Sequence, residues 1–71
     1  MRVLIVEDEK KVVGFIKKGL EEELYAVDAA EDGEEGLTMA EDNSYDLIVL
    51  DIMLPKIDGL EVLSRLRKKN I

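Results

Sequence analysis

The sequence predicts an α/β protein with a doubly wound parallel sheet. Short runs rich in β-branched residues alternate along the chain with longer segments whose apolar residues recur at helical spacing. Strands and helices that alternate in this way form parallel sheets with right-handed crossovers. The expected order of elements over residues 1–71 is therefore strand, helix, strand, helix, strand, helix.

Three segments are expected to form the strands. Residues 2–6 and 47–50 are continuous apolar runs, which are typical of strands buried on both faces of a sheet. Residues 25–30 alternate apolar with smaller or polar side chains, and Asp28 favours an edge position for this segment. The strand order 2-1-3 is favoured, because it places the two most apolar strands side by side and the edge-like strand outside.

Apolar periodicity predicts a helix after the first strand. Apolar residues recur there every three or four positions, and this spacing places them on one face of a helix. The face is expected to contain Val12, Phe15, Ile16, Gly19, Leu20 and Leu24.

The second and third helices are expected to begin at Asp32 and Asp58. A glutamate follows each aspartate three residues later, which is the spacing of a reciprocal capping box. Basic residues crowd the end of the third helix, where the helix dipole favours cations. The buried stripes are expected to contain Gly36, Leu37 and Ala40 in the second helix, and Val62, Leu63 and Leu66 in the third.

Composition excludes several kinds of site. The 71 residues form one domain at most and contain neither cysteine nor histidine, which excludes disulfides, thiolate ligands, imidazole bases and a phosphohistidine. No apolar run approaches the roughly 20 residues of a membrane span, and the N-terminus enters a strand directly, so a cytoplasmic protein is expected. The net charge of -7 argues against direct nucleic acid binding and is compatible with plain solubility or with cations.

Two of the predicted strands end in acidic residues. Glu7 and Asp8 follow the first strand, and Asp51 follows the third. In the 2-1-3 order these strands are neighbours, so the three carboxylates are expected to meet in one crevice. Close carboxylates repel unless they protonate or bind a cation, and oxygen ligands favour Mg2+, Mn2+ or Ca2+. Asp51 is the better candidate for a nucleophile that attacks phosphorus, because a loop and a helix follow its strand.

The segments VLIVEDE and YDLIVLDIMLPKIDGLEVLSRLR resemble the receiver domain of bacterial two-component response regulators. The motif DIMLP-x-x-DG is most similar to the motif of the subfamily in which a winged-helix DNA-binding domain follows the receiver. The resemblance extends over all 71 residues. It implies a flavodoxin-like fold truncated after the third helix, with residues 1–71 as the N-terminal half of a receiver domain. It also implies a sensor histidine kinase as partner.

The resemblance implies a role for each acid. Asp51 would be the phosphoacceptor. Glu7 and Asp8 would bind Mg2+ together with Asp51 and the backbone carbonyl of Met53. The Ser or Thr and the Lys that contact the phosphoryl group lie on the fourth and fifth strands of the family, and this chain has no counterpart of either.

Other positions of the resemblance concern the loops. Pro55 and Gly59 match the positions that shape the loop after the phosphoacceptor. Leu24 departs from the family, which usually has a glycine there to end the first helix. Three lysines lie close in sequence to the acids of the expected crevice. They are expected to be solvated: Lys10, Lys11 and Lys56.

Two functions remain open, and two others are disfavoured. A phosphoacceptor module is favoured for the natural protein, and a signalling-incompetent half-domain that self-associates is favoured slightly for the 71 residues alone. The outer edge of the third strand and the Phe15 side of the first helix would be bare, so a homodimer is expected. An aspartate-nucleophile phosphatase needs a second Asp where this chain has Met53, and flavin binding needs a Ser/Thr-rich phosphate loop that the sequence lacks. No enzyme activity is therefore expected.

Overall fold

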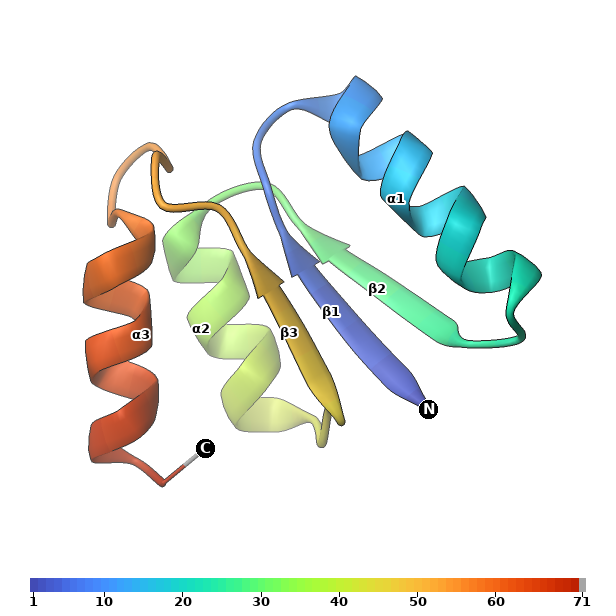
Figure 1. Ribbon diagram of the computed structural model, residues 1–71. Helices are drawn as coiled ribbons and strands as arrows, with labels where there is room; N and C mark the ends of the chain where they lie inside the picture. Colours follow the sequence, from blue (N-terminus) through green and yellow to red (C-terminus); the bar gives the residue numbers. More distant parts are fainter. Residues whose placement is uncertain (71) are drawn as a thin grey trace.

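The computed structural model describes residues 1–70 and shows strands and helices in strict alternation (Figure 1). The elements are β1 (Arg2–Val6), α1 (Lys10–Glu22), β2 (Ala26–Ala30), α2 (Gly33–Asp42), β3 (Leu47–Leu50) and α3 (Gly59–Lys68). Both strand pairs are parallel, and the order is β2-β1-β3. The predicted fold class, element order and strand order are confirmed. None of the described helices has the length and apolar character needed to cross a membrane.

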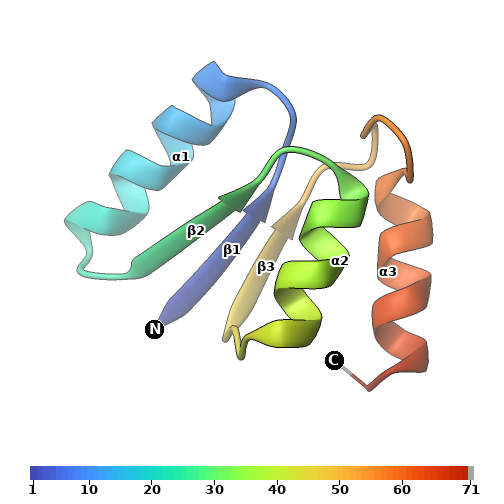
Figure 2. The same ribbon diagram turned by 180° about the vertical axis from the view of Figure 1, so that it is seen from behind.

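The sheet carries helices on both faces (Figures 1 and 2). Helix α1 covers one face, and α2 and α3 cover the other. Side chains of β1 alternate between the two layers, with Val3 and Ile5 facing α1 and with Leu4 and Val6 facing α2 and α3. All four are buried. Strand β1 is therefore the centre of both apolar layers.

Strand β3 is less buried than its sequence predicts. Leu47 is 45% exposed, and the other three residues of the strand are only partly buried. Among the described residues β3 pairs with β1 alone, so one of its edges is bare. The prediction of burial on both faces is wrong, because such burial requires a further strand and helix beside β3.

Helix α1 contacts the sheet through a stripe that differs from the predicted one, because Val13 packs on the sheet where Val12 is expected. Phe15 is 83% exposed, as expected for the bare side of this helix, and Gly19 is exposed as well. Leu24 lies beyond the end of the helix and is 91% exposed. Apolar spacing defines the stripe, but the position of the sheet decides which part of it is covered. The residues of α1 that pack on the sheet are Val13, Ile16 and Leu20.

Asp32 and Asp58 cap α2 and α3 as predicted. The Asp32 carboxylate accepts a hydrogen bond from the Glu35 N–H (2.8 Å), and the Asp58 carboxylate accepts one from the Glu61 N–H (2.9 Å). The reciprocal contacts differ from a capping box. Glu35 accepts from the backbone N–H of Glu31, one residue before the cap (3.0 Å). Glu61 pairs with an arginine one turn later in α3.

The predicted stripes of α2 and α3 are buried with one exception. Gly36 approaches β1 so closely that an added Cβ would lie 2.8 Å from the methyl groups of Val6. Leu63 is 40% exposed, because it faces the open side beyond β3. The buried members are Gly36, Leu37, Ala40, Val62 and Leu66.

A polar cluster at the amino end of the sheet was not predicted from the sequence. The Tyr45 hydroxyl donates to Asp28 (2.7 Å), and the Arg2 guanidinium pairs with the same carboxylate oxygen (3.3 Å). Arg2 also lies over the Tyr45 ring, 5.1 Å from its centre. Burial first, and then the hydrogen bond to Asp28, raise the pKa of Tyr45. The cluster joins the start of β1 to β2 and to the segment that leads into β3.

Candidate functional site

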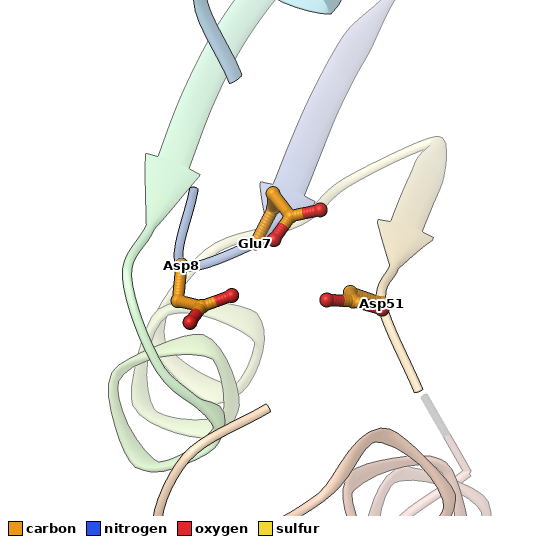
Figure 3. A group of neighbouring side chains, drawn as sticks. All are labelled: Glu7, Asp8 and Asp51. Carbon is orange, nitrogen blue, oxygen red and sulfur yellow. The ribbon is translucent and has the colours of Figure 1, made fainter. Parts of the chain in front are cut away.

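The carboxyl ends of β1 and β3 bring three carboxylates together (Figure 3). One oxygen each of Glu7, Asp8 and Asp51 lies within 4.8 Å of the other two. The strands end at the same level, since Val6 is in register with Leu50 and the Asp51 N–H donates to the Val6 carbonyl (3.0 Å). The structure therefore unites the three acids that the sequence predicts to share one crevice.

Backbone groups hold two of the three carboxylates. The Glu9 N–H donates to Glu7 (3.1 Å), and the Met53 N–H donates to Oδ1 of Asp51 (3.1 Å). Glu7 and Asp51 are partly buried, whereas Asp8 is exposed. In Figure 3 the carboxylates of Asp8 and Asp51 point toward each other from the two strand ends. The cluster is thus built from the turns that directly follow β1 and β3.

The pKa of Glu7 reflects the crowding of negative charge. The hydrogen bond from the Glu9 N–H lowers this pKa, but desolvation and the neighbouring Asp8 and Asp51 together raise it above its ordinary value. A bound cation stabilises the ionised form of carboxylates that lie this close together. Three carboxylate oxygens suit a hard ion such as Mg2+ better than a softer metal. The residues present therefore fit a divalent cation.

The lysines predicted to be solvated behave differently from one another. Lys10 and Lys11 are exposed. Lys56 is also largely exposed, but its amino group lies 3.4 Å from Oδ2 of Asp32 and 3.9 Å from Oε2 of Glu34. The exposure of Lys56 agrees with the prediction, but its ion pairs are not predicted, because the sequence does not reveal that the loop after β3 passes the start of α2.

The loop between β3 and α3 closes tightly at Gly59. The Gly59 N–H donates to the Ile52 carbonyl (2.9 Å). A Cβ on Gly59 would overlap the carbonyl oxygen of Asp51 and would lie 2.7 Å from Cα of Ile52. Only glycine fits this position without moving the backbone that carries Asp51. Pro55 and the side chain of Met53 are exposed in the same loop.

Known proteins resemble the chain in sequence. The family described as "Response regulator receiver domain" matches residues 3–71. The transcriptional activator protein IrlR of Burkholderia pseudomallei is 54% identical over 68 residues, and the match covers 96% of this chain and 30% of IrlR. The alkaline phosphatase synthesis transcriptional regulatory protein PhoP of Bacillus subtilis is 47% identical over 70 residues, with 99% and 29% covered. The chain spans about 30% of the length of these relatives.

Solved structures also resemble the chain, in both fold and sequence. The Francisella response regulator 1452 receiver domain gives a TM-score of 0.95 at 44% identity, with 99% of this chain and 58% of that chain covered. The response regulator TrrA of Thermotoga maritima, solved in complex with Mg2+-BeF, gives 0.92 at 47% identity, with 96% and 59% covered. TrrA in complex with the histidine kinase ThkA gives 0.90 at 47% identity, with the same coverage.

Proposed function

The chain belongs to the response regulator receiver family, and on this premise we propose that it accepts a phosphoryl group on Asp51 from the phosphohistidine of a sensor histidine kinase. The observation that carries the proposal is the cluster of Glu7, Asp8 and Asp51 at the tips of neighbouring strands. The complex of TrrA with ThkA supports the choice of partner.

Asp51 is the nucleophile of the proposed transfer. A carboxylate oxygen of Asp51 attacks phosphorus and forms a P–O bond, while the P–N bond of the phosphohistidine breaks and its electron pair returns to the imidazole. The hydrogen bond from the Met53 N–H to Oδ1 holds the carboxylate at the end of β3. The close approach of Gly59 to the Asp51 carbonyl fixes the backbone behind it, and Pro55 is proposed to shape the same loop.

Glu7, Asp8 and Asp51, together with the backbone carbonyl of Met53, would hold Mg2+. The oxygen donor set and the raised pKa of Glu7 support this assignment, as does the neighbour solved with Mg2+-BeF. When bound, the ion neutralises charge on the transferring phosphoryl group. Mn2+ or Ca2+ would be accepted by the same oxygens.

The proposed output is regulation of transcription in the cytoplasm. The names of IrlR and PhoP support it, since both are transcriptional regulators. The 71 residues themselves carry a net charge of -7, so direct contact with nucleic acid is assigned to a winged-helix domain and not to this chain.

A small phosphodonor with Mg2+ tests the proposal. We expect an acid-stable, base-labile phosphoryl adduct on Asp51, located by peptide mass spectrometry, and no adduct on Asp51→Asn. Without the Ser or Thr and the Lys of later strands, transfer to the 71 residues is expected to be about 10²-fold slower than to a complete receiver. An adduct that persists in Asp51→Asn, or none in the wild type after long incubation, would contradict the proposal.

A second candidate function is self-association through the bare edge of β3. An apolar groove lies between this edge and α3, and Leu47, Ile52 and Leu60 are exposed there. An unpaired strand edge beside an apolar groove is a typical association site. Phe15 on α1 provides a further exposed apolar side chain. In this alternative the chain forms a homodimer and does not signal.

Sedimentation at micromolar concentration tests the second candidate. A dimer is expected for the wild type, and a monomer for Leu60→Glu, whose side chain lines the groove. Leu24→Glu is the matched control, since Leu24 is exposed at the end of α1 and does not line the groove. A folded wild-type monomer, or equal weakening by both variants, would argue against this interface.

A further inference from the structure

The loop that carries Asp51 and Met53 is attached on two sides. On one side it is closed by the hydrogen bond from the Gly59 N–H to the Ile52 carbonyl (2.9 Å). On the other side it lies against the first turn of α2, where a Cβ on Gly33 would overlap the Ile57 carbonyl oxygen. The loop after β3 therefore packs against the start of α2, although the two segments are distant in sequence.

Lys56 makes the charged contact between this loop and α2. Its amino group lies 3.4 Å from Oδ2 of Asp32 and 3.9 Å from Oε2 of Glu34. Asp32 uses its other oxygen to cap α2 through the Glu35 N–H (2.8 Å). The pKa of Asp32 is lowered first by that N–H and then by Lys56. One carboxylate thus connects the start of α2 with the middle of the loop.

The backbone of Lys56 adopts an unfavourable conformation. Its φ angle is 66°, in the left-handed region that glycine populates readily and that other L-residues disfavour. A glycine at this position would relax the backbone, but it could not reach α2. The residue present therefore combines a disfavoured backbone with a side chain that reaches Asp32 and Glu34.

We infer that Lys56 is a positioning residue, which holds the loop after β3 against the start of α2 so that Asp51 and the Met53 carbonyl stay in place beside Glu7 and Asp8. The inference rests on the proposed function, since it assigns a purpose to the position of these groups. It makes α2 a part of the phosphoacceptor site through its cap residue Asp32.

Removal of the Lys56 side chain would change Mg2+ affinity in opposite directions, depending on whether Lys56 acts by holding the loop or only by its positive charge. Lys56 is a cation on the loop that follows Asp51, and the effect of its charge alone would be to weaken binding of a second cation. Removal of that charge would then tighten Mg2+ binding. Loss of a positioning contact has the opposite effect, because the loop carbonyl and Asp51 no longer stay at the site. Exposed ion pairs of this kind change equilibria by about two- to fivefold.

The test compares the wild type with Lys56→Met, Lys56→Arg and Lys56→Gly in the full chain. Two quantities are measured: hydrogen exchange of the Gly59 amide without metal, and the Mg2+ dissociation constant by calorimetry. Lys56→Met is expected to speed the exchange and to weaken Mg2+ binding, each by about two- to fivefold. Lys56→Arg is expected to restore both. Lys18→Met, in an exposed position on α1, is the control for loss of a lysine charge.

Lys56→Gly separates positioning from folding. It is expected to raise the melting temperature, because glycine relieves the left-handed backbone, and yet to weaken Mg2+ binding as Lys56→Met does. Unchanged Gly59 exchange together with equal or tighter Mg2+ binding in Lys56→Met would overturn the inference. If the wild type itself binds no Mg2+, the proposed function fails, whereas the exchange of the Gly59 amide still decides whether Lys56 holds the loop.

Discussion

The substitution Gly59→Ala tests directly the close contact between Gly59 and the backbone of Asp51. The added Cβ would overlap the Asp51 carbonyl oxygen and would lie 2.7 Å from Cα of Ile52 and 2.9 Å from the Asp51 carbonyl carbon. All of these atoms belong to the backbone, so no side chain can rotate to relieve the overlap. Overpacking of this kind costs about 1–3 kcal/mol. Replacement of a helical glycine by alanine returns about 0.5–1 kcal/mol. The net loss is expected to lie in the range of about 0–2.5 kcal/mol, with a central value of about 1 kcal/mol.

Urea unfolding followed by circular dichroism measures this loss. For a small protein with a slope of about 1 kcal/mol per molar urea, the central value of the loss lowers the midpoint by about 1 M. Gly14→Ala and Gly19→Ala are matched controls in α1, because a Cβ at either position meets nothing within 4 Å. Both are expected to raise stability by about 0.5–1 kcal/mol. The sign of the change therefore differs between Gly59 and the controls.

The same substitution connects stability with function. Because the overlap lies on the backbone of Asp51, Gly59→Ala is also expected to weaken Mg2+ binding, whereas the α1 controls leave it unchanged. A Gly59→Ala protein as stable as the Gly14→Ala protein, with Mg2+ affinity equal to that of the wild type, would refute the role given to this glycine.

Three further substitutions test other parts of the structure. Leu24→Gly is expected to stabilise the chain by about 1 kcal/mol, because Leu24 has a φ angle of 66° and an exposed side chain; a lower urea midpoint would contradict this. Tyr45→Phe removes the hydroxyl that donates to Asp28 and is expected to cost about 1 kcal/mol near neutral pH. Since the pKa of Tyr45 is raised above 10.0, its contribution is complete below that pH and is lost as the pH rises through the folded pKa, so the two proteins should converge in alkaline melting experiments. Glu7→Gln is expected to stabilise the metal-free chain at pH 7 and to weaken Mg2+ binding, because a carboxylate ligand is lost. The raised pKa of Glu7 favours folding below pH 4.5, and this advantage disappears as the carboxyl ionises; a metal-free variant less stable than the wild type at pH 7 would contradict the sign.

The topology and the acidic cluster follow from local features of the sequence. The acids after β1 and β3 stand where apolar runs end abruptly, and the edge-like character of Asp28 places β2 outside. With that order, Glu7, Asp8 and Asp51 meet without any further information. The caps at Asp32 and Asp58 are equally local, since each needs only the next three residues.

Features that depend on distant partners could not be predicted in this way. Leu63 has the spacing of a buried residue, yet it faces the open side beyond β3. The pairing of Lys56 with Asp32 depends on how the loop after β3 passes α2. The contact between Tyr45 and Asp28 joins residues that belong to different strands and loops. In each case the sequence specifies the side chain, and only the tertiary arrangement specifies its neighbour.

Leu24 shows a conformational constraint that the sequence alone only suggests. Helices often end in a left-handed residue, usually glycine, and the resemblance places a glycine here. The structure retains the left-handed backbone with leucine in place of glycine. The fold therefore imposes the turn on a residue that disfavours it.

Calorimetric titration with Mg2+ is the most direct test of the claim that β1 and β3 deliver their terminal acids to one cation site. Binding is expected for the wild type and for Glu22→Gln, whose side chain lies at the far end of α1 from the cluster. Asp51→Asn is expected to abolish the binding heat. Equal heats for the wild type and Asp51→Asn, or no heat for the wild type, would contradict the claim.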